Sequence, residues 1–159
     1  DAGNKRAFNP RNTGNAWVHL DMPYDINEEE NGLLIEVTGF AVPFEFADCA
    51  ALLAAHPRRL SHHYHLFDFS GIDQDSQFAL TDAIGADYAK RSRAIHGDTL
   101  MPYMTALVSP HSKIQVVFQA FIDAAPRPPG HELRRFTNLK QARTWIRERL
   151  AGDGSENAG

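Results

Sequence analysis

Four of the eight histidines lie within ten residues of one another, at His56, His62, His63 and His65. Zinc sites in proteins are built from convergent imidazole, thiolate and carboxylate ligands. His63 and His65 are two residues apart, a spacing that puts both imidazoles on one face of a strand, where they could chelate a metal ion. A catalytic zinc needs a third protein ligand, and the spacing specifies none. The prediction here is therefore a solvated loop that enters a strand, with no metal and no other cofactor.

A second set of polar residues follows two apolar segments. Asp68 and Ser70 close the first segment, and Ser109, His111 and Lys113 follow the second. If these segments are parallel strands, their carboxyl ends meet at the sheet edge where α/β proteins bind ligands. The amides after Ser109, together with Lys113, make this edge a candidate anion site.

The same edge contains the side chains of a hydrolytic triad, namely Asp68, Ser109 and His111. Ser109 is however followed by proline, as in a helix cap, and no Gly-x-Ser-x-Gly elbow occurs. We therefore expect no catalytic residue. Asp68 is expected to accept hydrogen bonds from backbone amides of the loop that follows it.

Composition narrows the function classes further. The chain has 159 residues, 43% hydrophobic and 23% charged, with a net charge of −4. The weakly acidic balance argues against nucleic-acid binding and against a polybasic membrane anchor. No apolar run approaches the ~20 residues that span a bilayer, so no stable membrane insertion is expected. Glycine-rich phosphate loops do not occur, which argues against ATP and dinucleotides.

Cys49 is the only cysteine, so no disulfide can form within the chain. Its apolar helical setting predicts a buried, inert thiol. A protein without disulfides suits a reducing compartment, and the expected location is the cytoplasm.

The elements that must position these residues alternate along the chain. We expect one α/β domain with a mixed sheet over residues 17–150, between flexible ends at 1–16 and 151–159. An antiparallel hairpin around the acidic turn 27–32 opens the sheet, and parallel strands with helical crossovers follow. A homodimer that exchanges a terminal arm is one arrangement such ends would allow. The expected strands are 17–26, 33–40, 64–69, 102–108 and 133–136, and the expected helices are 44–55, 75–93, 109–125 and 138–150.

Two of these helices have the clearest signals. Apolar residues at 114, 117, 118, 121, 122 and 125 keep a three/four spacing, which predicts an amphipathic helix that begins at a Ser109 cap. Asn138 and Gln141 form a capping-box pair for the last helix.

Three strings stand out in this order of elements. They are Leu66-Phe67-Asp68-Phe69-Ser70-Gly71, Ala106-Leu107-Val108-Ser109-Pro110, and Leu133-Arg134-Arg135-Phe136 followed by Asn138-Leu139. Together with the element order, the strings resemble the SpoIIAA-like family, which is related to STAS and CRAL-TRIO-like domains. Trp145 matches a tryptophan near the end of that family's last helix, and the resemblance spans about residues 18–150.

The resemblance implies a bacterial-type, non-enzymatic regulatory or binding domain that engages a protein partner or a small hydrophobic ligand. An alternative is an anti-anti-sigma type partner-switching protein, in which Ser76 would be phosphorylated. The family's Asp-Ser-x-Gly string is only partly present, since Asp75-Ser76-Gln77-Phe78 lacks the glycine. A helix cap is therefore the expected role of Ser76. A hydrolase that uses Asp68, Ser109 and His111 is the minor alternative.

Overall fold

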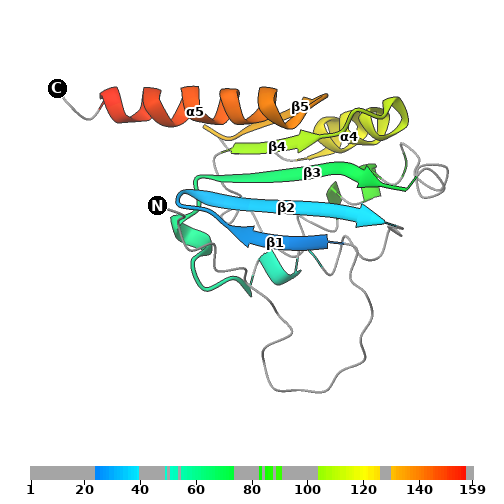
Figure 1. The fold of residues 1–159 in the computed structure, drawn as a ribbon, viewed down its shortest axis with the longest axis horizontal. Helices are drawn as coiled ribbons and strands as arrows, with labels where there is room; N and C mark the ends of the chain where they lie inside the picture. Colours follow the sequence, from blue (N-terminus) through cyan, green and yellow to red (C-terminus); the bar gives the residue numbers. More distant parts are fainter. Residues whose placement is uncertain are drawn as a thin grey trace, which may run out of the picture.

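Five strands form one mixed sheet in the computed structural model, which describes residues 24–39, 49, 51–53, 55–73, 83, 85–87, 89–90, 104–125 and 130–156. β1 runs antiparallel to β2, and β2 to β5 are mutually parallel (Figure 1). The order in the sheet equals the order in the chain, which confirms the expected mixed sheet. The strands are β1 (Tyr24–Glu28), β2 (Gly32–Gly39), β3 (Tyr64–Ile72), β4 (Met104–Val108) and β5 (Glu132–Phe136).

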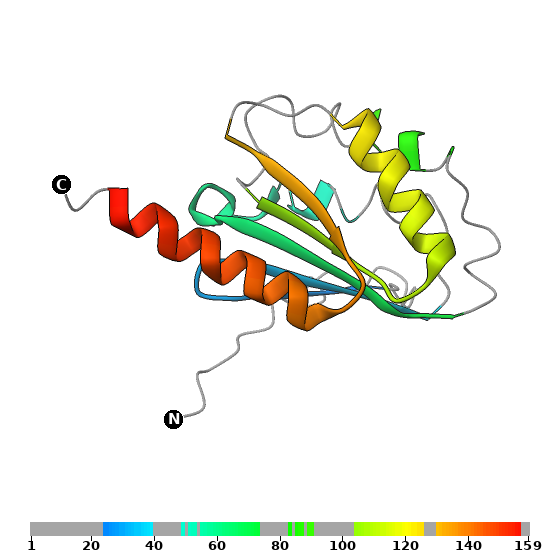
Figure 2. The ribbon, with the colours of Figure 1, turned by 90° about the horizontal axis from the view of Figure 1, so that it is seen from above.

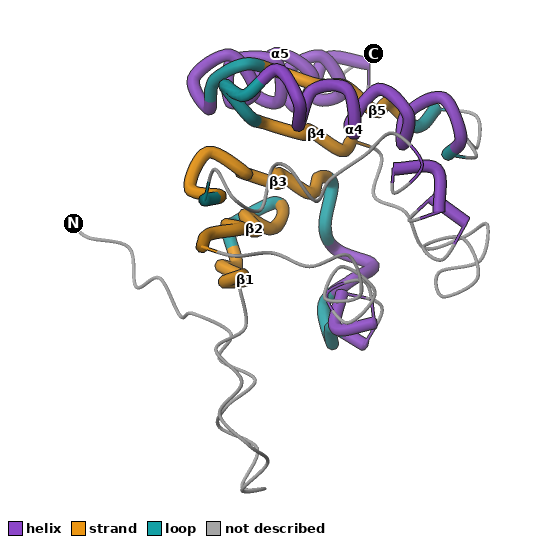
Figure 3. The backbone as a smooth tube through the Cα atoms, turned by 90° about the vertical axis from the view of Figure 1, so that its right-hand side faces the viewer, coloured by secondary structure: helices purple, strands orange, loops and turns teal. Residues whose placement is uncertain are grey.

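The helices cover both faces of this sheet. Because right-handed crossovers between sequential parallel strands all fall on one side, the helical residues between 49 and 55, those between 83 and 90, and α4 (Ser112–Ala124) share a face. The final helix α5 (Leu139–Glu156) lies on the other face (Figures 2 and 3). Among the helices of the described residues, none has the length and apolar character needed to cross a membrane.

Each face has its own apolar core. On the α4 face, strand residues pack against Cys49, Leu53, Ala89 and one side of α4. Cys49 is buried, as predicted, and its thiol forms no disulfide. The α4 side chains in this core are Ile114, Phe118, Phe121 and Ile122, which confirms the amphipathic pattern. On the other face, Ala142, Trp145 and Ile146 of α5 cover residues of β3 and β4.

The structure corrects the start of α4. Ser109 was expected to cap this helix, but the helix begins at Ser112, and His111 is the N-cap residue. Ser109 lies fully buried at the end of β4, where its N–H donates to the carbonyl of Phe136 (3.1 Å). Its hydroxyl accepts the N–H of His111 (3.2 Å), a local turn that delays the helix.

The final helix begins as predicted and ends later. The Asn138 carboxamide oxygen accepts the N–H of Gln141 (2.9 Å), which is half of a capping box. The other half is replaced, because the Gln141 side chain accepts the hydroxyl of Thr137 (3.1 Å). α5 continues to Glu156, six residues beyond the expected boundary at Leu150. Ser76 and the expected arm 1–16 lie outside the described residues.

A polar network fixes the β1–β2 turn against α5. Arg143 of α5 donates two hydrogen bonds to the carboxylate of Glu29 (2.6 and 2.9 Å), and the hydroxyl of Tyr64 donates to the same carboxylate. Gly32 is needed at the start of β2, because a Cβ there would lie 2.5 Å from the carbonyl oxygen of Tyr64. The network therefore anchors the turn that follows Glu28.

Tyr64 should resist ionisation as long as the protein is folded. Burial, followed by its hydrogen bond to Glu29, raises the pKa of Tyr64 far above its usual 10. The native pKa thus exceeds the unfolded one, so the stabilisation is fully present below pH 10 and is lost as the pH rises through the native pKa. In an alkaline titration followed at 295 nm, one of the four tyrosines should ionise only on unfolding. Tyr64→Phe should abolish that late step, and an unchanged titration in this variant would contradict the expectation.

Candidate functional site

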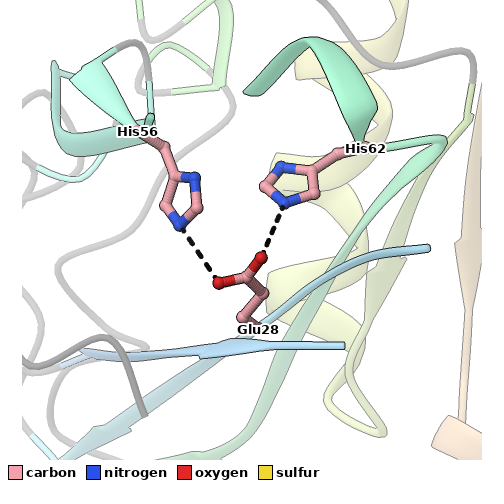
Figure 4. Close-up of side chains that lie close together, drawn as sticks. All are labelled: Glu28, His56 and His62. Atoms are coloured by element: carbon pink, nitrogen blue, oxygen red, sulfur yellow. Dashed lines mark ion pairs between the residues drawn. The ribbon is translucent and has the colours of Figure 1, made fainter. Parts of the chain in front are cut away.

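Glu28, His56 and His62 converge at the edge formed by the amino ends of the parallel strands (Figure 4). Glu28 is the last residue of β1, and the antiparallel pairing puts it opposite Leu33 at the start of β2. The loop of residues 56–63 leads into β3, whose first residue pairs with the first residue of β2. Strand direction alone thus brings the hairpin and this loop to the same edge.

Local hydrogen bonds place the two histidines at the ends of a compact loop. Its middle is the 3-10 helix η2 (Arg59–Ser61), where the Ser61 N–H and hydroxyl both donate to the carbonyl of Arg58 (2.9 and 2.8 Å). The N–H of His63 donates to the carbonyl of Asn31 (2.7 Å), which ties the loop to the β1–β2 turn. The backbone therefore holds His56 and His62 beside Glu28.

The three side chains lie close but do not hydrogen-bond to one another. His56 Nε2 is 3.9 Å from Glu28 Oε2, and His62 Nε2 is 3.8 Å from Glu28 Oε1. The imidazole side chains are 2% and 1% exposed, whereas the Glu28 side chain is 22% exposed. The two rings are 4.8 Å apart between centroids, and His65 continues the row at 6.3 Å from His62.

Burial keeps both imidazoles in their neutral form. Desolvation lowers the pKa of His56 and His62 from 6.5, and it outweighs the opposite effect of the Glu28 carboxylate. For His62, the neighbouring His56 lowers the pKa further. Neutral imidazole is the form that binds metal ions.

His62 is the unusual member of the cluster. Neither of its ring nitrogens has a hydrogen-bond partner among the described residues, although both are buried. Leaving a buried polar group unpaired costs about 1–3 kcal/mol, so such a group in a folded protein requires an explanation such as a bound ion.

The cluster has the ligand types of a transition-metal site, in a wider spacing than a bound ion would set. Zinc binds imidazole nitrogen and carboxylate oxygen at about 2.0–2.2 Å, which puts the ligand atoms of a tetrahedral site about 3.3 Å apart. One ligand atom from each of Glu28, His56 and His62 lies within 4.8 Å of the others. A contraction of about half an ångström would bring the carboxylate to bonding distance of an ion shared with either imidazole. Two imidazoles and one carboxylate suit zinc and its neighbours better than Ca²⁺ or Mg²⁺, which prefer oxygen ligands.

The histidines that converge are not the pair selected from the sequence. His63 is exposed in the loop before β3, whereas His65 is buried on the strand. The two-residue rule holds only within a strand, and β3 begins at Tyr64. The third ligand, Glu28, was missed because it belongs to the hairpin and is 28 residues away from His56. Strand direction was the one signal that could have linked them, since β1 ends where β3 begins.

The other predicted residues lie at the opposite edge of the sheet, at the carboxyl ends of the parallel strands. There Asp68 and Ser109 each form hydrogen bonds with residues close to them in sequence. Asp68 is the register partner of Val108, so it does lie at the same edge as Ser109. Its Oδ1 accepts the N–H and the hydroxyl of Ser70 (3.0 and 2.6 Å), which confirms the expected bond to a backbone amide of the following residues. Within the described part of the chain, no hydrogen bond joins Asp68, Ser109 and the His111 ring.

Gln115 occupies the space between the ends of β4 and β5. Its side-chain amide donates to the carbonyls of Ser109 and Phe136 (2.7 and 2.8 Å). Lys113, the expected anion ligand, is exposed in the first turn of α4. The edge at the carboxyl ends of the strands, where the sequence predicted a ligand site, thus carries hydrogen bonds within the chain, and the Glu28–His56–His62 cluster lies at the opposite edge.

The fold and the cluster define an α/β domain with a mixed five-stranded sheet and a His–His–Glu group whose two imidazoles are buried. No family model, curated protein or solved structure matches this chain. The resemblance to the SpoIIAA-like family therefore depends on the three strings and the element order alone.

Proposed function

We propose that this protein is a non-enzymatic binding domain that takes a divalent transition-metal ion, with zinc as the reference ion, on Glu28, His56 and His62. The observation that carries the proposal is His62, whose buried imidazole has no hydrogen-bond partner in the described part of the chain and directs Nε2 toward the Glu28 carboxylate. A metal ion would satisfy this nitrogen and neutralise the carboxylate at the same time.

Burial supports a binding role over a catalytic one. Catalytic zinc keeps an open position that substrate can reach. Here both imidazoles are almost fully enclosed. Glu28 is the most exposed of the three residues, and the Arg58 guanidinium contacts its carboxylate at 2.6 Å. A regulatory role, which the family resemblance implies, is consistent with an enclosed site whose metal content acts as the signal.

Loss of His62 should abolish tight zinc binding. Wild-type protein should bind one zinc per chain in a competition titration against a chromogenic chelator. Removal of residues that merely support a metal ligand costs about 10–100-fold in affinity, so His62→Ala should lose about 100-fold or more. His63→Ala is the matched control, because it removes an exposed imidazole one residue away, and it should bind like the wild type.

Glu28→Gln separates a lost ligand from a damaged fold. Glu28 is partly exposed, so this nearly isosteric change should leave the circular dichroism spectrum intact and still weaken zinc binding at least about tenfold. Equal zinc affinity in the wild type, His62→Ala and Glu28→Gln would overturn the proposal, as would the absence of stoichiometric binding by the wild type.

A further inference from the structure

We propose that Arg58 is a built-in competitor of the metal ion, which holds two of the three ligands in the metal-free protein and is released when the ion binds. This inference rests on the proposed function of the Glu28–His56–His62 cluster. Arg58 then helps to set the affinity for the metal ion, and the surface loop of residues 56–63 changes when the ion binds.

The first contact of Arg58 with a metal ligand is its ion pair with Glu28. Arg58 Nη1 lies 2.6 Å from Glu28 Oε1, so the guanidinium occupies the carboxylate that the metal would use. The contact is close but is an ion pair without hydrogen-bond geometry, because Glu28 Oε1 accepts no hydrogen bond from the described residues. The Arg58 side chain is 59% exposed, and ion pairs of such side chains are weak. A divalent ion can therefore displace the guanidinium, while a fixed positive charge beside the site opposes the ion.

The second contact is a hydrogen bond from the Arg58 backbone to His56. The N–H of Arg58 donates to Nδ1 of His56 (3.1 Å), so Nδ1 is an acceptor and the proton of the neutral ring resides on Nε2. Nε2 is the nitrogen that faces Glu28. For Nε2 to bind a metal, the ring proton must move to Nδ1, which can then no longer accept the Arg58 N–H. The metal and this hydrogen bond are mutually exclusive.

The ion pair with Glu28 and the hydrogen bond to His56 both belong to Arg58, the residue before η2, so metal binding releases them together. Metal binding frees the Arg58 guanidinium and loosens the turn that precedes Arg59 and Leu60, both exposed. By linkage, any acidic group that binds Arg58 would tighten metal binding by the same factor by which the metal strengthens that contact.

The test is a zinc titration of Arg58→Met beside Arg59→Met. Both variants remove one positive charge from the same turn, but only Arg58 contacts Glu28. Arg58→Met should bind zinc about fivefold more tightly than the wild type, and this gain should shrink at high salt. Arg59→Met should stay within about twofold of the wild type, since the ion pairs of Glu28 in the described part of the chain are with Arg58, His56 and His62 and not with Arg59.

The His56 tautomer provides an independent readout. Nitrogen-15 spectra of the wild type should show His56 protonated at Nε2 without zinc and at Nδ1 with zinc. If the wild type binds zinc but Arg58→Met binds equally or more weakly, the inference is wrong and the metal site stands. An unchanged His56 tautomer in the zinc-loaded protein would also overturn it. If the wild type does not bind zinc, the proposed function itself fails.

Discussion

Zinc at about a thousand times its dissociation constant is expected to stabilise the folded protein by about 4.1 kcal/mol. For a domain of this size, the midpoint of thermal unfolding should then rise by roughly 8–16 °C. The reason is that the ligands meet only in the folded chain, where the β1–β2 hairpin and the 56–63 loop share one edge of the sheet. Thermal scans followed by circular dichroism, with zinc and after removal of zinc by a chelator, measure the shift.

The same scans on two variants show whether the shift arises at this site. His62→Ala should show almost no response to zinc, whereas His63→Ala should respond like the wild type. Magnesium should have little effect on either protein, because a site with two imidazoles disfavours it. A full zinc response in His62→Ala would mean that the ion stabilises the protein through other residues.

Trp145→Ala is expected to destabilise the protein by about 3–5 kcal/mol, the usual cost of truncating a large aromatic side chain in a core. Trp145 is 6% exposed and is the largest side chain by which α5 covers the sheet. Its ring packs against Phe136 of β5 at 5.4 Å, and the guanidinium of Arg134 lies 5.5 Å from its centroid. Without the indole, α5 loses its main contact with the end of β5. Urea unfolding followed at 222 nm measures the loss.

Trp145→Phe should cost far less, about 1.5 kcal/mol or below. The indole N–H is buried without a hydrogen-bond partner among the described residues, so phenylalanine removes an unsatisfied donor together with some apolar area. A loss of stability as large as that of Trp145→Ala would show that the indole makes an essential polar contact, contrary to the structure.

The features that were predicted from sequence depend on short-range patterns. The three/four spacing of Ile114, Phe118 and Phe121 predicted α4, because a helix that packs one side against a core shows this spacing whatever the core is made of. The Asn138 cap is likewise decided within four residues. The hairpin around the acidic turn 27–32 was also predicted from a local pattern, and β1 and β2 do pair antiparallel.

The features that were missed depend on contacts between distant segments. Ser109 and a following proline look locally like a helix cap, but the carbonyl of Phe136 accepts the Ser109 N–H and the Gln115 side chain donates to the Ser109 carbonyl, so the helix starts later. The candidate site was missed for the same reason. Glu28 comes near His56 and His62 only because β1 is antiparallel to its neighbours, a relation between strands that no local spacing expresses.

The most direct test of the metal site is a crystal structure of the zinc-soaked protein with diffraction data on both sides of the zinc absorption edge. We predict one strong anomalous peak per chain, within about 2.0–2.2 Å of Glu28, His56 Nε2 and His62 Nε2. The Arg58 guanidinium should no longer contact Glu28 in that structure. A peak at other residues, with His62 still without a partner and Arg58 still on Glu28, would contradict the account.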